Sequence, residues 1–172
     1  QISQLSHALR DGDKIIASVA PAYISQFGDD VTPGKFKTAL QVLGFSDVHE
    51  VAFGADVGAI SEAHHYAKEV ATGNLPFLLT SCCPSWSMMA KKLFPEQAKC
   101  ISMALTPMVL TARLIKQKEP DCKIVFVGPC AAKKLEASRK SIRSYVDFVL
   151  TFEEVAGMFD AKGVDWKDIP EG

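Results

Sequence analysis

The sequence has almost no net charge and no long apolar segment. Its 172 residues carry a formal net charge of −1, so it lacks the basic field that attracts nucleic acid or an anionic membrane. No apolar run approaches the roughly 20 residues that cross a bilayer. Residues 1–10 are polar and amphipathic and contain no signal-peptide core. We therefore expect a cytoplasmic protein without a nucleic-acid or membrane partner.

The chain also lacks the patterns of the commonest cysteine sites. Five cysteines is an odd number, and the neighbours Cys82 and Cys83 cannot easily bridge each other, which argues for reduced thiols. Structural zinc sites usually come as paired C-x₂₋₄-C units, which are absent. A cysteine hydrolase needs a histidine partner for its nucleophile. The chain has four histidines, and none lies in a recognisable cysteine-hydrolase motif: His7, His49, His64 and His65. The remaining possibility is a site in which cysteine thiolates bind iron and sulfide.

No repeat, low-complexity tract or linker interrupts the chain, and its length suits one hydrophobic core. We therefore predict a single domain over residues 1–172. Because the chain begins at Gln1 without a methionine and ends on KDIPEG, we also expect a piece of a longer protein. Any site that it carries is then expected to be part of a larger site.

Strand and helix patterns alternate along the chain. Apolar runs predict strands at 14–20, 47–53, 75–81, 123–129 and 147–151. Helical spacing predicts helices at 33–43, 55–72, 84–93 and 106–118, and one after Thr151. Thr32 and Thr106, each followed by proline, and a capping box of Thr151 and Glu154 mark helix starts. Apolar strands between helices indicate an α/β fold, with a mostly parallel sheet of about four to five strands and helices on both faces.

Three predicted strands end in unusual residues: APA at 20–22, SCCP at 81–84 and GPC at 128–130. The carboxyl ends of parallel strands meet at one edge of a sheet, where ligands bind in such folds. Cys82, Cys83 and Cys130 each follow a strand at a turn, and a helix N-terminus there favours the thiolate form. Cys100 and Cys122 are expected to be buried as small hydrophobes. The pattern predicts a thiol-lined site at this edge.

Two cysteine motifs carry a resemblance to a known family. TSCCPSW at 80–86 and PCAAKKLEA at 129–137 place Cys83 and Cys130 47 positions apart. They resemble the first two active-site signatures of the iron-only (FeFe) hydrogenases. SVAPA at 18–22, GADVGAISEA at 54–63 and DFVLTFEE at 147–154 also resemble family segments, in order. The resemblance spans essentially the whole chain and implies the first lobe of the H-cluster domain.

The resemblance also implies roles for single residues. Cys82 would donate protons beside the di-iron centre, since a thiol can pass protons between solvent and a metal-bound base. Cys83 and Cys130 would ligate the 4Fe–4S part of the H-cluster. Lys133 would bind a cyanide ligand on iron, because its ammonium is a compact cation. Further residues implied to line the cofactor are Ala20, Pro21 and Thr106. Further residues implied to carry protons are Glu62, Ser102 and Glu136.

The implied activity is the reversible reduction of protons to H₂, with electrons from a carrier such as ferredoxin. The family's third signature, which supplies the two other cluster cysteines as C-x₃-C, is absent from this sequence. A 4Fe–4S cluster needs four thiolates, so a C-terminal lobe of the same protein is the expected partner. We expect the chain alone to fold without the 4Fe–4S cluster or the di-iron subcluster and to expose an apolar, cysteine-lined face.

Three positions depart from the family pattern. His65 stands where the relay has a glutamate, and a histidine can also pass protons. Met108 replaces a glutamine that contacts the diatomic ligands, and Gly128 replaces a methionine that packs against the bridging carbonyl. These changes favour a hydrogen- or redox-sensing protein with little turnover as one alternative. An iron–sulfur assembly relative is another, disfavoured by the intact Cys82 and Lys133. A zinc or redox-dithiol protein comes last.

Overall fold

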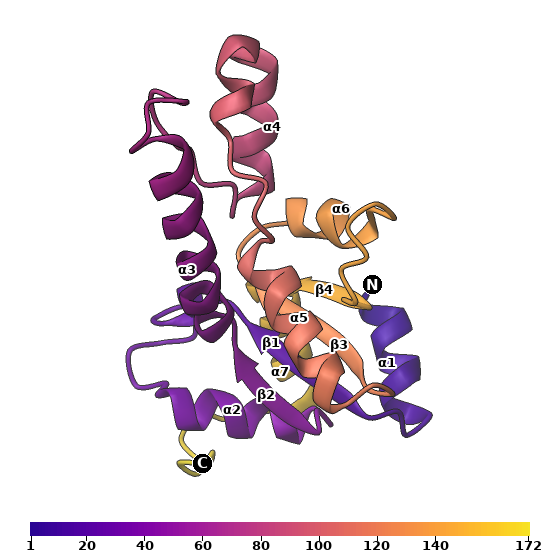
Figure 1. Ribbon diagram of the computed structural model, residues 1–172. Helices are drawn as coiled ribbons and strands as arrows, with labels where there is room; N and C mark the ends of the chain where they lie inside the picture. Colours follow the sequence, from indigo (N-terminus) through magenta and orange to yellow (C-terminus); the bar gives the residue numbers. More distant parts are fainter.

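The computed structural model describes all 172 residues and contains one parallel four-stranded sheet, in the order β2-β1-β3-β4 (Figure 1). The strands are β1 Ile15–Val19, β2 Asp47–Glu50, β3 Lys123–Gly128 and β4 Phe148–Thr151. The α-helices are α1 Ile2–Arg10, α2 Pro33–Val42, α3 Val51–Glu69, α4 Pro84–Leu93, α5 Pro107–Lys118, α6 Ala132–Ser138 and α7 Phe152–Lys162. Two 3₁₀ turns span Pro21–Tyr23 and Pro95–Cys100.

Helices cover both faces of this sheet. On one face, α2 packs against α7, where the rings of Phe36 and Phe159 meet edge to face at 6.0 Å. On the other face, α5 lies across the central strands (Figure 1). All five residues of β1 are buried, as are all residues of β3 after Lys123. The parallel sheet with helices on both faces confirms the predicted α/β fold. Coverage on both faces also explains why β1 and β3 are apolar.

The prediction of a strand at 75–81 is wrong. This segment makes a single bridge outside the sheet, in which the Leu79 amide donates to the Cys100 carbonyl and the Ser102 amide donates to the Leu79 carbonyl. An apolar run of this length does not distinguish a sheet strand from an extended connection. Two boundaries also differ: β2 ends at Glu50, and α3 starts at Val51 instead of residue 55.

The predicted helix caps are largely confirmed. The Thr32 hydroxyl accepts a hydrogen bond from the Lys35 amide. Thr151 and Glu154 form the full capping box, with each side chain accepting from the other's backbone amide. Both caps satisfy amides that the first helical turn leaves free. Thr106 precedes α5 as predicted, but its side chain does not cap that helix.

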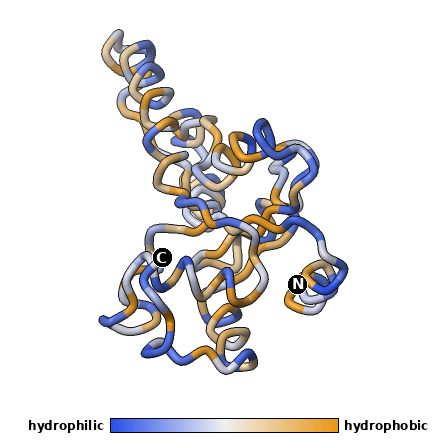
Figure 2. Tube along the Cα trace, turned by 90° about the horizontal axis from the view of Figure 1, so that it is seen from below, coloured by the Kyte–Doolittle hydropathy of each residue, from blue (hydrophilic) through white to orange (hydrophobic).

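Helices α3 and α4 extend beyond the sheet, and much of their apolar surface has no partner (Figure 1). In Figure 2, apolar and hydrophilic segments alternate along the helical part at the upper left. The most exposed large apolar side chains in this part are Phe53, Ile60, Leu93, Phe94 and Met103. Exposed large apolar side chains gathered in one part of a molecule are typical of an interaction site. None of the helices is long and apolar enough to cross a membrane.

Gly54 allows the close packing of α3 on α5. A Cβ atom at this position would lie 2.1 Å from Thr111 Oγ1 and 3.0 Å from the Pro107 carbonyl oxygen. Gly54→Ala is therefore expected to lower the free energy of unfolding by about 2 kcal/mol, because it overpacks a helix contact. Urea denaturation measures the change. The matched control is Gly157→Ala in α7, where a Cβ meets nothing within 4 Å; equal effects in the two variants would contradict this packing.

Candidate functional site

Cys82, Cys83 and Cys130 line one cavity of about 260 Å³. Its walls are mainly apolar and come from six places: the end of β1, the start of α3, the loop before α4, the start of α5, the end of β3 and the first turn of α6. The predicted convergence at the carboxyl edge of the sheet is therefore found. Two of the three segments follow strands, whereas the Cys82–Cys83 loop reaches the cavity from outside the sheet. Ala20 and Pro21 also line this cavity.

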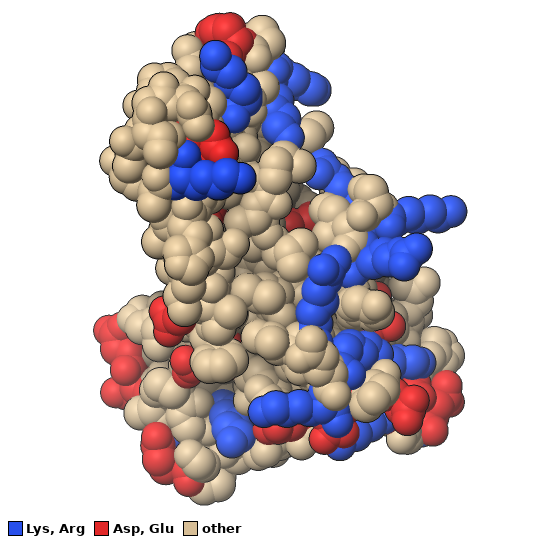
Figure 3. Space-filling model, viewed as in Figure 1, with Lys and Arg blue, Asp and Glu red and all other residues tan.

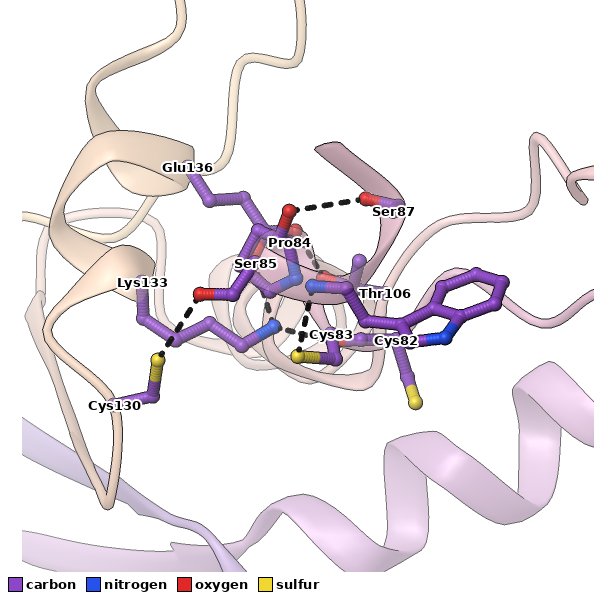
Figure 4. Close-up of polar contacts among 10 residues, drawn as sticks. Cys82, Cys83, Pro84, Ser85, Ser87, Thr106, Cys130, Lys133 and Glu136 are labelled. Atoms are coloured by element: carbon purple, nitrogen blue, oxygen red, sulfur yellow. Dashed lines mark hydrogen bonds and ion pairs between the residues drawn. The ribbon is translucent and has the colours of Figure 1, made fainter. Parts of the chain in front are cut away.

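Short-range contacts fix the two thiols that are predicted to bind metal. Cys83 is the N-cap of α4, and its Sγ accepts a hydrogen bond from the Trp86 amide at 3.5 Å. Pro84 occupies the first turn, where a proline fits without losing a hydrogen bond. One residue further, the Ser85 hydroxyl contacts Cys130 Sγ at 3.8 Å (Figure 4). The first turn of α4 thus links the Cys83 and Cys130 segments.

Lys133, Glu136 and Thr106 form a buried polar network beside the cysteines (Figure 4). Lys133 Nζ donates to the Cys82 carbonyl oxygen at 2.8 Å and to Glu136 Oε2 at 2.7 Å. Thr106 Oγ1 donates to Glu136 Oε1 at 2.7 Å, which explains why this hydroxyl does not cap α5. Only 3% of the Glu136 side chain is exposed. A buried ion pair persists where hydrogen bonds satisfy it, and here each carboxylate oxygen has a donor.

The predicted proton-carrying residues fall into two further cavities. Glu62 and Cys82 line one of about 200 Å³ beneath α3. Ser102 and Glu136 line another of about 150 Å³. Thr106 borders both cavities, so the two lie next to each other. Glu62 and Cys82 therefore border one cavity, whereas Ser102 borders the neighbouring one.

The three departures from the family pattern differ in their surroundings. His65 is half-buried on α3, one turn beyond Glu62, and borders none of these three cavities. Met108 is fully buried and lines the cysteine cavity. At Gly128, a Cβ atom would lie 2.5 and 2.7 Å from two ring carbons of Phe126. The Phe126 ring therefore occupies the space over Gly128 and forms part of the cavity wall.

This arrangement makes a prediction for Gly128. Gly128→Ala is expected to destabilise the fold by about 1–3 kcal/mol, because the new methyl group overlaps the ring of a buried phenylalanine. The double variant Gly128→Ala/Phe126→Leu is expected to recover part of this loss. Thermal unfolding of the two single variants and the double variant measures the coupling free energy between positions 126 and 128. Additive effects would contradict the direct contact between Phe126 and position 128.

The two remaining cysteines lie in the core, as expected. Cys100 and Cys122 are both fully buried, and neither borders the cysteine cavity. Burial raises the pKa of the Cys122 thiol, which keeps it protonated and unreactive. All five cysteines are free thiols.

Several cavity residues were not found from the sequence. The start of α3 contributes Val51, Ala52 and Ala55, and β3 contributes Phe126. The β2–α3 junction gave no usable signal, because a valine at 51 continues a strand pattern as well as it opens a helix. Ser85 was also missed, although its position in the turn after the two cysteines was a signal for it.

The fold and this cavity define an α/β protein that presents cysteine thiols and a buried lysine–glutamate pair at the carboxyl end of a parallel sheet. The family model described as "iron only hydrogenase large subunit, C-terminal domain" matches residues 13–172. This chain belongs to that family.

Individual relatives agree with this assignment. The chain is 32% identical to the periplasmic Fe-hydrogenase large subunit of Nitratidesulfovibrio vulgaris, over 99% of this chain and 46% of the relative. It is 34% identical to the cytosolic Fe–S cluster assembly factor NAR1 of Kluyveromyces lactis, over 67% of this chain and 24% of that one. Among solved structures, apo FeFe-hydrogenase HydA1 from Chlamydomonas reinhardtii superposes with a TM-score of 0.84 at 27% identity, covering all of this chain and 50% of that one. The chain thus spans half or less of their lengths.

Proposed function

We propose that this chain is the first lobe of an iron-only hydrogenase that interconverts protons and H₂ at an H-cluster. One observation carries the proposal: Cys82, Cys83, Cys130 and Lys133 line a single cavity at the carboxyl edge of the sheet. Two thiols suit iron–sulfur ligation, a third thiol suits proton transfer, and a fixed ammonium suits an anionic ligand. No single simpler site, such as zinc or a redox dithiol, uses all four groups.

The residues fit one half of a 4Fe–4S site. Cys83 and Cys130 are held near each other through Ser85, and they supply two of the four thiolates that such a cluster needs. No group of three or more His, Cys, Asp or Glu side chains in the chain is placed to hold a metal by itself. Two further ligands then come from the second lobe. When bound, the H-cluster would supply the iron chemistry that acts on hydrogen and would pass electrons to and from an external carrier.

The side chains of this lobe bind, orient and carry protons around that group. Cys82 exchanges protons with Glu62 through the cavity that both residues line. Lys133, fixed by Glu136 and by the Cys82 carbonyl, offers its remaining N–H to an anionic ligand. Ala20 and Pro21 form the apolar wall opposite, while Thr106 holds Glu136 in place. Two further residues belong to the proposed proton route through the adjacent cavity: Ser102 and Glu136.

The exposed apolar surface of α3 and α4 is where we propose that the second lobe packs. It adjoins the cysteine cavity, and the relatives have about as much chain again as this one spans. Residues 1–172 would then be one domain of a larger protein. The five free thiols suit the cytoplasm, and a carrier such as ferredoxin would deliver electrons to the complete site.

A second candidate is a hydrogen- or redox-sensing protein with little turnover. The observation that favours it is the cavity wall, where Met108 and the Phe126 ring over Gly128 put apolar groups around the site of the cofactor. Fewer polar contacts there reduce the tuning of a bound metal group by its surroundings. The chain is also similar to an iron–sulfur cluster assembly factor. The test must therefore be able to detect an assembly role.

The test uses the complete protein, matured with the di-iron cofactor under anaerobic conditions. Hydrogen evolution from a reduced viologen is compared between the wild type and Cys82→Ala. The proposal predicts sustained evolution that falls by about 100-fold or more in the variant. Trace evolution that does not depend on Cys82, with the cluster present spectroscopically, would favour the sensor. An iron–sulfur cluster without uptake of the di-iron cofactor would favour the assembly role.

A further inference from the structure

A further depression, of about 600 Å³, shares no lining residue with the three cavities described above, and the elements that form it lie to the right of α3 in Figure 1. It is formed by the C-terminal half of α5 and the loop that connects α6 to β4. Lys and Arg side chains gather on this side, at the right of Figure 3. The lining residues are Arg113, Lys116, Gln117, Pro120, Arg143 and Tyr145. Three of these six are cations, and none is acidic.

No carboxylate neutralises these cations. Arg113 Nη2 donates to the Ile142 carbonyl at 2.5 Å, and Lys116 Nζ donates to the carbonyls of Pro120 and Cys122. None of the ion pairs in the protein includes Arg113, Lys116 or Arg143. Arg113 Nε is buried and has no acceptor at all. Arg113 and Lys116 lie one helical turn apart, where like charges repel each other, and neither has a carboxylate within ion-pair distance.

The loop that supplies Arg143 is strained but well anchored. Arg143 and Tyr145 adopt left-handed conformations, with φ of 47° and 60°. Such conformations cost non-glycine residues about 1–3 kcal/mol each and cluster where a ligand is bound. Between them, the buried Ser144 hydroxyl donates to the Ala137 carbonyl and accepts from the Val146 amide. The anchored loop points Arg143 and the half-exposed Tyr145 into the depression.

We propose that this depression binds a small phosphate-bearing molecule. A guanidinium fork matches the geometry of phosphate oxygens, and the volume is within the range of small-molecule sites. The Tyr145 ring offers a flat wall for a planar group next to the phosphate. Met108 of the cysteine cavity and Arg113 of this depression are the lining residues closest together on α5, five residues or about 7.5 Å of helix rise apart. The two sites share no lining residue, so binding at each can be tested separately.

The test is calorimetric titration of the complete protein with two probes, inorganic phosphate and phenyl phosphate. Both are expected to bind at one site, with phenyl phosphate binding more tightly. Arg143→Gln is expected to weaken both by about tenfold, since it removes one charge-assisted contact. Tyr145→Asn, which tolerates the left-handed conformation, is expected to abolish the advantage of the phenyl group.

The matched control is Lys162→Gln, which removes an exposed, unpaired cation on α7. It is expected to leave both affinities unchanged. Equal weakening by Arg143→Gln and Lys162→Gln would show only non-specific attraction and would overturn the proposal. The absence of saturable binding by either probe would overturn it too. Circular dichroism and unfolding curves of each variant verify that a lost signal reflects binding and not unfolding.

Discussion

Lys133→Met is expected to destabilise the protein by about 3–5 kcal/mol, because it leaves the buried carboxylate of Glu136 without its cation. The loss should also free the loop that carries Cys82, since Lys133 Nζ binds the carbonyl of that residue. Hydrogen evolution by the complete protein is expected to fall with it. Chemical denaturation and the viologen assay measure the two effects.

Two companion variants separate stability from function. Lys134→Met removes the neighbouring lysine, which pairs with the half-buried Glu154, and is expected to cost about 1 kcal/mol or less. The double variant Lys133→Met/Glu136→Leu replaces the buried pair with apolar groups and is expected to recover much of the stability. It should not recover hydrogen evolution. Restored activity in the double variant would contradict the role proposed for the Lys133 ammonium.

Serine exchanges at the two adjacent cysteines are expected to have different consequences. Cys83→Ser removes a proposed cluster ligand, so the complete protein should lose most of its cluster iron and sulfide, because serine oxygen is a poor replacement for thiolate. Cys130→Ser should behave in the same way. Cys82→Ser should keep the cluster and lose about 100-fold or more in hydrogen evolution. Iron and sulfide analysis, together with the activity assay, measures the difference.

The adjacent pair thus provides its own control, since the two exchanges differ by one position in the same loop. Equal iron loss in Cys82→Ser and Cys83→Ser would mean that the loop is only structurally sensitive. Full iron content in Cys83→Ser would remove Cys83 from the proposed ligand set.

Much of the fold was predictable because its signals are local. The capping box at Thr151 and the proline after Thr32 fix helix starts through contacts within four residues. β1 and β3 are apolar throughout because they are covered on both faces. Their ends carry Pro21 and Cys130, so the edge that holds the cavity could also be located.

The remainder depends on contacts between distant segments. Residues 75–81 have the composition of a strand, but Leu79 pairs outside the sheet with the segment around Ile101. Thr106 has the sequence of a helix cap, but its hydroxyl binds Glu136, 30 residues away. Tertiary contacts in these places outweigh local preference.

The most direct test of the central claim is the formation of HD from D₂ in ordinary water by the complete, cofactor-loaded protein. This exchange needs no electron carrier. It therefore reports only on hydrogen activation and on proton transfer through Cys82. We predict steady HD formation by the wild type and a loss of about 100-fold in Cys82→Ala. No HD formation by a wild-type protein that carries its full complement of iron would contradict the claim that this lobe serves a hydrogen-activating site.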